Sequence, residues 1–497
     1  MRILYTSILA VLLILGTSAD NPSPLQLFQF SYENILGTSF DLKLTARSEY
    51  IASEAGEAAL NEIGRLSDIL NTYDPQSEFS RWQKTLEAEV PVSPELFEVM
   101  TMFEDWQVCT GGALNPAVGA ATAIWKKADE TDTFPTEAEL AQAVEVLNKR
   151  HWILDEDNMT ARHLTTDPLI FNTFVKGYII GRVSDRIMEI PGVSSSLVNI
   201  GGDMVVRGDM KEKIGIADPD HPSDNYHPVS AIKISDKAVA TSGNYRRGFN
   251  VGGEWYSHIL DARTAIPAKE IISATVVSDD PVEAGAMATA FNILSPEESW
   301  ILAKQTEGID FLIITEDGRH FKSDGWDELA VNDEKESSPS EKLTDFELKI
   351  EIELARFEGR SLRPYVAVWV EDENSVPVRT LALWFNNYRW LPDLRRWYAK
   401  HYEKSQQFDF MQSVTSATRS AGKYSLYWDL TDDNNRTVKP GKYTVHIEAS
   451  RERGTYQLMS KEIELNNKAK RLDITGGVEV TSAALDYSKV NRNNASL

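Results

Sequence analysis

Val198-Asn199-Ile200-Gly201-Gly202-Asp203 is the most informative stretch of this sequence. A β-branched, apolar run that ends in two glycines predicts a strand followed by a tight turn. Because glycines carry no side chain, such a turn lets the backbone come close to a ligand. A Gly-Gly pair by itself is more often only a turn, so any functional reading depends on the motifs that accompany it.

Helical and extended patterns occur on both sides of this stretch. Leu60, Ile63, Leu66 and Leu70 recur at the spacing of one helix face. Residues 198–206 and 271–277 read as strands interrupted by Gly or polar residues. These patterns predict an α+β or α/β domain that covers residues 28–330.

Two further motifs contain side chains suited to a phosphate or a proton. Lys176-Gly177-Tyr178 follows an apolar run, and a Lys beside a Gly can meet a phosphate. In residues 256–264, His258 and Asp261 lie three positions apart and Arg263 follows, which suits proton transfer or the orientation of a phosphate. Each motif also has a structural interpretation, because Lys is common at helix starts and a single His near an Asp usually only stabilises the fold.

Residues 284–291, Ala-Gly-Ala-Met-Ala-Thr-Ala-Phe, predict a helix of small side chains. Gly285 and Thr289 lie one turn apart and share a face, while Ala286, Ala290 and Ile293 mark the buried side. A helix of this composition usually indicates tight packing against a neighbour.

Taken in this order, the motifs resemble those of the FAD:protein FMN transferases, known as ApbE-type flavin transferases. The resemblance runs from Leu36 to Gly325. The matching segments are residues 36–38, 66–81, 111–116, 176–178, 199–203, 240–247, 257–261 and 284–291. The set in this order is far more specific than any single member of it.

The resemblance implies that the chain binds FAD, uses Mg²⁺ on its pyrophosphate, and transfers FMN to a Thr hydroxyl of an acceptor protein with release of AMP. It implies that His258 is the general base, that Asp261 orients it or acts at the metal, and that Thr289 is a metal ligand. The residues that it implies around the flavin nucleotide are Lys176, Tyr178, Asn199, Gly201, Gly202, Asp203, Ser242, Arg246 and Arg263.

The sequence departs from the family pattern at acidic positions. Gly285 stands where the family usually has Asp, a principal Mg²⁺ ligand, and loss of that carboxylate should weaken metal binding. Glu283, two positions away, faces another side of the helix and cannot substitute. The other departures are Asn115, Gly181 and Asn244, where Asp is common, and Ala265, which replaces a usual Gly. The alternative to an active transferase is therefore a catalytically degenerate FAD-binding protein or a periplasmic scaffold.

The C-terminal part of the sequence differs in composition and in the period of its apolar residues. Residues 331–342 are polar, charged and contain Pro, which is the composition of a linker. Beyond them the period changes to two, as in residues 348–354, where Leu and Ile alternate with Lys and Glu. We predict an all-β, sandwich-like domain over residues 343–475 and a polar, disordered tail over residues 476–497.

One segment of this β-rich region resembles a flavin acceptor motif. Family acceptors carry Asp-x-x-Ser/Thr-Gly-Ala-Thr, with FMN joined to the last Thr, and residues 412–418 read Gln-Ser-Val-Thr-Ser-Ala-Thr. The resemblance implies Thr418 as a candidate FMN acceptor within the same chain. Gln412 and Ser416 depart from the motif, and a Ser/Thr-rich turn between strands is the simpler interpretation.

The first residues predict an export signal. Arg2 precedes an apolar run over residues 3–15, and the small residues Thr17 and Ala19 fit cleavage after residue 19. No Cys follows the run, so we expect a non-lipidated periplasmic protein. No later apolar run is long enough for an integral membrane segment.

The charge balance and the single cysteine limit other functions. Lys and Arg total 51 and Asp and Glu total 75, for a net charge of −24. This balance argues against nucleic-acid partners and anionic membranes, which need a basic surface. Cys109 lies in an apolar stretch, so we expect a buried structural residue rather than a thiol catalyst.

Overall fold

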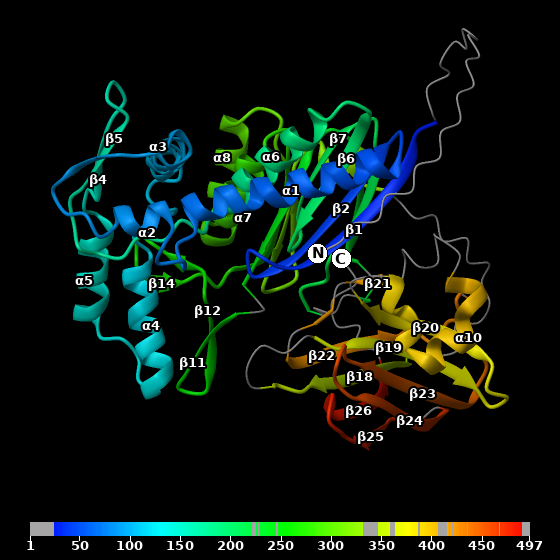
Figure 1. Ribbon diagram of the computed structural model, residues 1–497. Helices are drawn as coiled ribbons and strands as arrows, with labels where there is room; N and C mark the ends of the chain where they lie inside the picture. Colours follow the sequence, from blue (N-terminus) through cyan, green and yellow to red (C-terminus); the bar gives the residue numbers. More distant parts are fainter. Residues whose placement is uncertain are drawn as a thin grey trace, which may run out of the picture.

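The computed structural model describes residues 24–489 except 221–224, 227, 245–246, 332–345, 358–362, 386–387, 406–414, 417, 420, 435 and 467. The predicted signal peptide and residues 332–342 of the predicted linker lie outside the described residues. The described residues form two separate groups of hydrophobic cores, one over residues 40–326 and the other over residues 346–487. The chain therefore folds as two domains (Figure 1).

An eight-stranded antiparallel sheet forms the centre of the N-terminal domain (Figure 1). Its strands, in spatial order, are β1 (Gln26–Ile35), β2 (Thr38–Ala46), β6 (Val193–Ile200), β7 (Asp203–Gly208), β10 (Ala238–Gly243), β15 (Ile271–Ser278), β16 (Asp310–Thr315) and β17 (His320–Lys322). Phe40, Leu42 and Leu44 alternate along β2 toward one buried face. The predicted strand over residues 271–277 is confirmed as β15, whereas residues 198–206 form a hairpin made of the end of β6, the Gly201-Gly202 turn and the start of β7.

Helices cover that buried face of the sheet. They are α1 (Glu49–Leu70), α6 (Val175–Met188) and α7 (Pro281–Ile293). The predicted helix face is confirmed in α1, where Ile63, Leu66 and Leu70 are buried. Ser48 begins this helix, because its side chain accepts a hydrogen bond from the backbone N–H of Ile51.

The opposite face of the sheet is covered by a hairpin and a short helix. The hairpin consists of β8 (Glu212–Ile216) and β9 (Ser230–Ile234), and the helix is α9 (Trp326–Leu329). Ile214, Ile232 and Trp326 pack there against apolar side chains of the central strands. Both faces of the sheet are thus buried, each by its own core.

The remaining elements of this domain lie around the sheet. The helices are α2 (Glu78–Trp82), α3 (Pro94–Cys109), α4 (Gly119–Thr131), α5 (Glu137–Leu147) and α8 (Pro296–Gln305). The short strands are β3 (Glu89–Pro91), β4 (Trp152–Asp155), β5 (Thr160–His163), β11 (Gly248–Val251), β12 (Glu254–Ser257), β13 (Leu260–Asp261) and β14 (Ile266–Pro267). Among the described residues, no helix combines the length and apolar composition needed to cross a membrane.

The C-terminal domain is β-rich, as predicted (Figure 1). One sheet has the order β22 (Gly422–Trp428), β18 (Phe346–Leu354), β26 (Val480–Lys489), β25 (Lys470–Thr475). The other has the order β21 (Thr415–Ser416), β20 (Pro377–Trp384), β19 (Tyr365–Asp372), β23 (Gly441–Ser450), β24 (Tyr456–Leu465). The two sheets share one core, and η1 (Tyr388–Asp393) and α10 (Arg395–Ser405) cover the outer face of the second sheet.

The prediction of a polar, disordered tail from residue 476 is wrong over residues 480–489. These residues form β26, which pairs with β18 on one side and β25 on the other. Val480, Leu485 and Tyr487 are buried in the core of the sandwich. The small and polar residues between these three hide the alternation that marks the strand.

The expectation that Cys109 is buried is also wrong, because its side chain is exposed. Cys109 is the last residue of α3, and the buried residues of that helix end at Phe103. Of the apolar neighbours that suggested burial, Phe103 and Trp106 pack on the core, but Val108 beside Cys109 is itself exposed.

Candidate functional site

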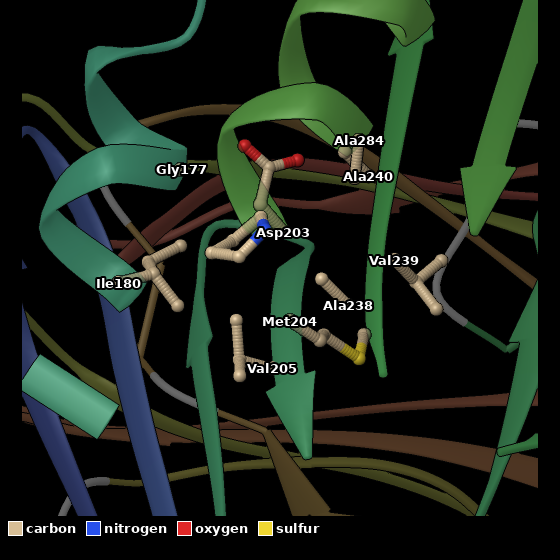
Figure 2. Close-up of a pocket in the computed structure, with 10 residues that line it drawn as sticks. Gly177, Ile180, Asp203, Met204, Val205, Ala238, Val239, Ala240 and Ala284 are labelled. Carbon is tan, nitrogen blue, oxygen red and sulfur yellow. The ribbon is translucent and has the colours of Figure 1, made fainter. Parts of the chain in front are cut away.

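A shallow pocket lies between the first turn of α6, the start of α7 and strands β7 and β10 (Figure 2). The Asp203 carboxylate points into the space between the two helices, beside Gly177 and Ala284 (Figure 2). The pocket has an empty volume of about 150 Å³, part of it open to solvent. Cofactor pockets are usually larger, so this gap between packed residues is not a preformed cofactor cavity.

Lys176 brings an ammonium into this corner, where the Asp203 carboxylate balances its charge. Its ammonium lies 2.7 Å from the Asp203 carboxylate and is about one third exposed. Burial raises the pKa of the Asp203 carboxyl, and the Lys176 ammonium opposes that shift. Lys176 lies in the first turn of α6, whose N-terminus has no side-chain cap. The N–H groups of that turn and the Lys176 ammonium together suit an anion.

The Gly201-Gly202 turn joins β6 to β7 beside Asp203. Both glycines have positive φ, at 61° and 98°, which is the region that favours glycine. A Cβ at Gly201 would lie 2.7 Å from a methyl carbon of Thr38, so the turn packs directly on the start of β2. Asn199 holds the turn, because its side-chain oxygen accepts a hydrogen bond from the Gly202 N–H at 3.0 Å.

Two glycines of α6 allow the start of α7 to approach closely. A Cβ at Gly177 would lie 2.3 Å from the carbonyl oxygen of Pro281, and a Cβ at Gly181 would lie 2.8 Å from the Pro281 ring. Pro281 is at the first position of α7, where its missing N–H costs nothing. At position 181, where the family usually has Asp, this chain therefore has a glycine that allows α6 to pack closely on α7.

Gly285 has no such steric requirement. A Cβ there would be in ordinary contact with Phe174, 3.6 Å from its Cα, and 3.9 Å from the Thr173 carbonyl oxygen. Thr289 lies on the same face, and its hydroxyl donates to the Gly285 carbonyl at 3.1 Å. This face offers neutral oxygen atoms only, and within the described ranges no group of three His, Cys, Asp or Glu side chains could hold a metal ion. The donor set does not fit Mg²⁺, which prefers carboxylates.

His258 follows β12 in the segment between β10 and β15. Its Nδ1 lies 3.0 Å from the Arg247 carbonyl oxygen. A carbonyl can only accept, so Nδ1 carries the proton and Nε2 keeps a free lone pair. Burial lowers the pKa of the imidazole, and the charge of Arg247 lowers it further. The side chain is nevertheless exposed, so a neutral base is accessible at Nε2.

Asp261 pairs with Arg263 and not with His258, while its alternative role at the metal stays a prediction. Among the described contacts its carboxylate accepts hydrogen bonds from the backbone N–H and the guanidinium of Arg263, in a bidentate pair. The imidazole of His258 is oriented by the Arg247 carbonyl, so the expectation that Asp261 orients His258 is wrong. Arg263 also pairs with Glu298 at 2.9 Å, and both of its carboxylate contacts would compete with a phosphate.

Two more of the expected ligand residues have structural partners. The Tyr178 hydroxyl donates to Glu98 of α3 at 2.7 Å, and its ring is buried between α6 and α3. Arg182 also donates a hydrogen bond to the Glu98 carboxylate, so two residues of α6 share this acceptor. Ser242 lies near the end of β10, where its carbonyl accepts from Asn292 of α7 at 2.7 Å. Arg246 lies outside the described residues.

Asn115 and Asn244, which stand where the family usually has Asp, act as structural amides. Asn115 donates to the Leu147 carbonyl and accepts from the Ala117 N–H. Asn244 donates to the Ile271 carbonyl at 2.9 Å. These bonds need the amide nitrogen, which a carboxylate lacks.

Ala265 stands where the family usually has Gly, and its backbone explains that preference. Its φ is 59°, in the left-handed region that costs a non-glycine residue about 1 kcal/mol or more. Trp125 donates to the Ala265 carbonyl at 2.9 Å and the methyl is fully buried, which holds the turn in place.

Thr418 is buried, with 2% of its surface exposed, and its carbonyl accepts a hydrogen bond from Arg363. Its hydroxyl cannot meet a flavin nucleotide in this arrangement without movement of the chain. The role of Thr418 as an acceptor stays a prediction.

The strand order places the residues around Asp203 and the segment that carries His258 at the same end of the sheet. Val239 of β10 lies opposite Met204 of β7, so β10 runs past Asp203 before it ends at Gly243. The segment that carries His258 leaves the sheet at that point and returns at Ile271, opposite the same end of β10. Lys176, Asp203, the Gly201-Gly202 turn and the His258 segment therefore share this end.

Sequence reasoning did not find the partners that fix this site. Arg247 holds His258 through a backbone carbonyl, which every residue carries, so no side-chain pattern could reveal it. Pro281 could have been suspected as the first residue of a predicted helix, but its contact with Gly177 depends on tertiary packing. The pair between Asp261 and Arg263, two positions apart, was visible as a local charge pattern.

Comparisons with known proteins agree with this fold. An FAD:protein FMN transferase from Klebsiella pneumoniae is 27% identical over 292 residues, which cover 58% of this chain and 89% of that protein. One from Vibrio cholerae is 26% identical over 293 residues, covering 57% and 86%. The crystal structure of the ApbE protein from Thermotoga maritima aligns with 62% of this chain and all of its own, with a TM-score of 0.55 and 24% identity.

The family models divide the chain in the same way as its cores. Residues 345–482 match a family described as predicted periplasmic protein (DUF2271). Residues 36–313, more than half of the chain, match the model of the ApbE family. The chain therefore belongs to the ApbE family and carries a C-terminal β-rich domain of the predicted periplasmic type.

Proposed function

We propose that this protein is an FAD:protein FMN transferase that binds FAD at the end of the sheet formed by β6, β7 and β10. The observation that carries the proposal is the Lys176–Asp203 pair, at 2.7 Å, at an uncapped helix N-terminus beside the Gly201-Gly202 turn. A cation and oriented N–H groups suit the pyrophosphate of FAD. The family relatives named FAD:protein FMN transferases support the same substrate.

In the proposed reaction, a Thr hydroxyl of an acceptor protein attacks the flavin-side phosphorus of FAD. His258 takes the hydroxyl proton at Nε2, the new O–P bond joins FMN to the acceptor, and the bond between the flavin-side phosphorus and the bridging oxygen breaks, so that AMP leaves with that oxygen. The Arg247 carbonyl supports this role, because it keeps the proton on Nδ1. Arg263 contributes through Asp261 and the shape of the loop rather than as a free cation.

A catalytically degenerate FAD-binding protein is the second candidate, and Gly285 favours it. Metal-assisted transfer needs a carboxylate on this face, and Gly285 and Thr289 provide none. Asp203, the carboxylate in the nearby pocket, is paired with Lys176. We derive no step through Mg²⁺, and we infer that transfer by this protein is slow unless another ligand completes the site.

Titration calorimetry with FAD tests the proposed site. We expect binding by the wild type and at least about tenfold weaker binding by Lys176→Ala, because a charged contact to phosphate is lost. Lys322→Ala is the matched control: Lys322 also pairs with an Asp, at 2.7 Å, but it lies in β17 at the outer edge of the sheet and does not line the pocket. No heat of FAD binding, with or without Mg²⁺, would reject the proposal.

The acceptor and the location of the protein are further proposals. We propose export to the periplasm, which the C-terminal family match supports. That the protein is not lipidated rests on the sequence alone and stays a prediction. Thr418 stays a candidate acceptor. Co-expression with an active transferase and intact mass spectrometry test it, since the wild type should gain one FMN phosphoester and Thr418→Ala should not. An unmodified wild type would show that residues 412–418 resemble the acceptor motif only by coincidence.

A further inference from the structure

The two domains meet at a strand edge of the β-rich domain. β22 is an outer strand of its sheet, with β18 on its other side. Asn225, from the β8–β9 connection of the N-terminal domain, donates its amide to the Tyr427 carbonyl at 2.8 Å and accepts from the Tyr427 N–H at 3.0 Å. One side chain thus satisfies both backbone groups of an edge residue, as a neighbouring strand would.

Aromatic and charged contacts surround this pair. The rings of Tyr226 and Tyr427 pack edge to face, with centroids 5.0 Å apart. Burial and the nearby Glu347 of β18 raise the pKa of Tyr226 to about 12. Burial also raises the pKa of Asp41 of β2, and the hydrogen bond from Ser31 and the positive charge of Arg419 of the β-rich domain oppose that shift.

We propose that the β-rich domain docks on its own flavin domain as a fixed partner, with Asn225 sealing the open edge of β22. Open strand edges invite pairing with other chains, and a side chain that occupies both backbone groups removes one such pairing point. The docking does not depend on the transferase activity proposed above.

The docked domain leaves the pocket accessible. Phe40 and Leu42 of β2 face the helices, so Asp41 between them faces the other side of the sheet. The pocket at Asp203 lies on the helix side, against α6 and α7. If the chain transfers FMN, the docked form serves an acceptor from another molecule, and modification of Thr418 requires undocking.

A cleavable chain tests the docking directly. A specific protease site placed within residues 332–342 allows the folded protein to be cut between its domains. We expect the two fragments to co-elute in size-exclusion chromatography at micromolar concentration. Asn225→Ala should raise their dissociation constant about tenfold, because two hydrogen bonds are lost. Asp220→Ala, an exposed residue of the same connection, should leave it unchanged.

Amide hydrogen exchange on the uncut chain gives a second test that does not depend on fragment folding. The backbone N–H and C=O of Tyr427 face Asn225. The N–H and C=O groups of the neighbouring residues, Leu426 and Trp428, therefore point toward β18. In Asn225→Ala, exchange of the Tyr427 amide should accelerate at least about tenfold, while the Leu426 and Trp428 amides stay slow. Separation of the wild-type fragments, an unchanged dissociation constant in Asn225→Ala, or unchanged exchange at Tyr427 would each overturn the proposal.

Discussion

The His258 segment and the α6–α7 helix pair lie at the same end of the sheet but differ in what they retain of a catalytic site. In the segment, a neutral imidazole with an accessible Nε2 is held in a defined tautomer by the Arg247 carbonyl. In the helix pair, the positions expected to be acidic are Gly181 and Gly285. The proton-accepting part of the site is complete, whereas the metal-binding part lacks its carboxylate.

The two glycines of the helix pair differ from each other as well. Gly181 is required by the Pro281 ring, so a side chain there conflicts with packing. Gly285 is surrounded by ordinary contact distances, so the backbone can accept a side chain. A Cβ therefore fits at position 285 but not at position 181, so Gly285→Asp is the substitution that can test whether a carboxylate strengthens transfer.

The largest effect is expected from His258→Ala, which should lower FMN transfer by about 10²- to 10⁴-fold through loss of the general base. FAD affinity should stay the same, because the expected pyrophosphate contacts are at Lys176 and α6. His320→Ala, at an exposed histidine of β17, is the control. Transfer rates measured with saturating FAD decide the matter, and full activity in His258→Ala would assign the base to another residue.

Gly285→Asp should raise Mg²⁺-dependent transfer at least about tenfold, because a carboxylate next to Thr289 and the Thr173 carbonyl supplies the missing anionic ligand. Gly285→Asn has the same shape without the charge and should give no gain. Activity is measured over a Mg²⁺ titration. If the wild type already turns over at full speed and Gly285→Asp changes nothing, another residue supplies the ligand.

The helix contact predicts opposite effects of alanine on stability. Gly177→Ala forces its methyl against the Pro281 carbonyl and should lower the free energy of unfolding by about 1–3 kcal/mol. Gly285→Ala meets no such contact and should be neutral or stabilising by up to about 1 kcal/mol, as expected for Ala in a helix interior. Denaturant unfolding of both variants measures the difference, and equal stabilities would show that α6 and α7 do not pack as described.

The smallest effect concerns pH. Burial lowers the pKa of His258 below its ordinary value of about 6.5, so the neutral, proton-accepting form dominates at pH 7 and above. The transfer rate should be flat from about pH 7 to 8 and fall only below the ordinary histidine pKa. A pH–rate profile checks this, and a rate that already declines between pH 8 and 7 would mean that the titrating base is not a histidine with a lowered pKa.

The sequence was most informative where one periodicity or one local pattern suffices. The helix face of Ile63, Leu66 and Leu70 and the alternation of β18 were both predicted correctly. Strand β26 was missed because its stability depends on pairing with β18, whose residues lie far away in the sequence.

In the site, residue types were easier to predict than partners. His258 and Lys176 could be singled out by their chemistry and by the family resemblance. The pairing of Asp261 with Arg263 instead of His258, and the contact between Gly181 and Pro281, depend on the fold of a loop and on helix packing. The closeness of Asp261 and Arg263 can be read along the chain, but the choice of Arg263 over His258 as the partner of Asp261 cannot, and neither can the helix contact.

Release of AMP from FAD is the most direct test of the central claim, that this protein keeps a working base but has a weakened metal site. The assay combines purified protein, FAD, Mg²⁺ and an acceptor peptide that contains the family motif. We predict slow release by the wild type, faster and Mg²⁺-dependent release by Gly285→Asp, and none above background by His258→Ala. Absence of AMP in both the wild type and Gly285→Asp, although FAD is bound, would contradict the account and identify the protein as a flavin-binding protein without transferase activity.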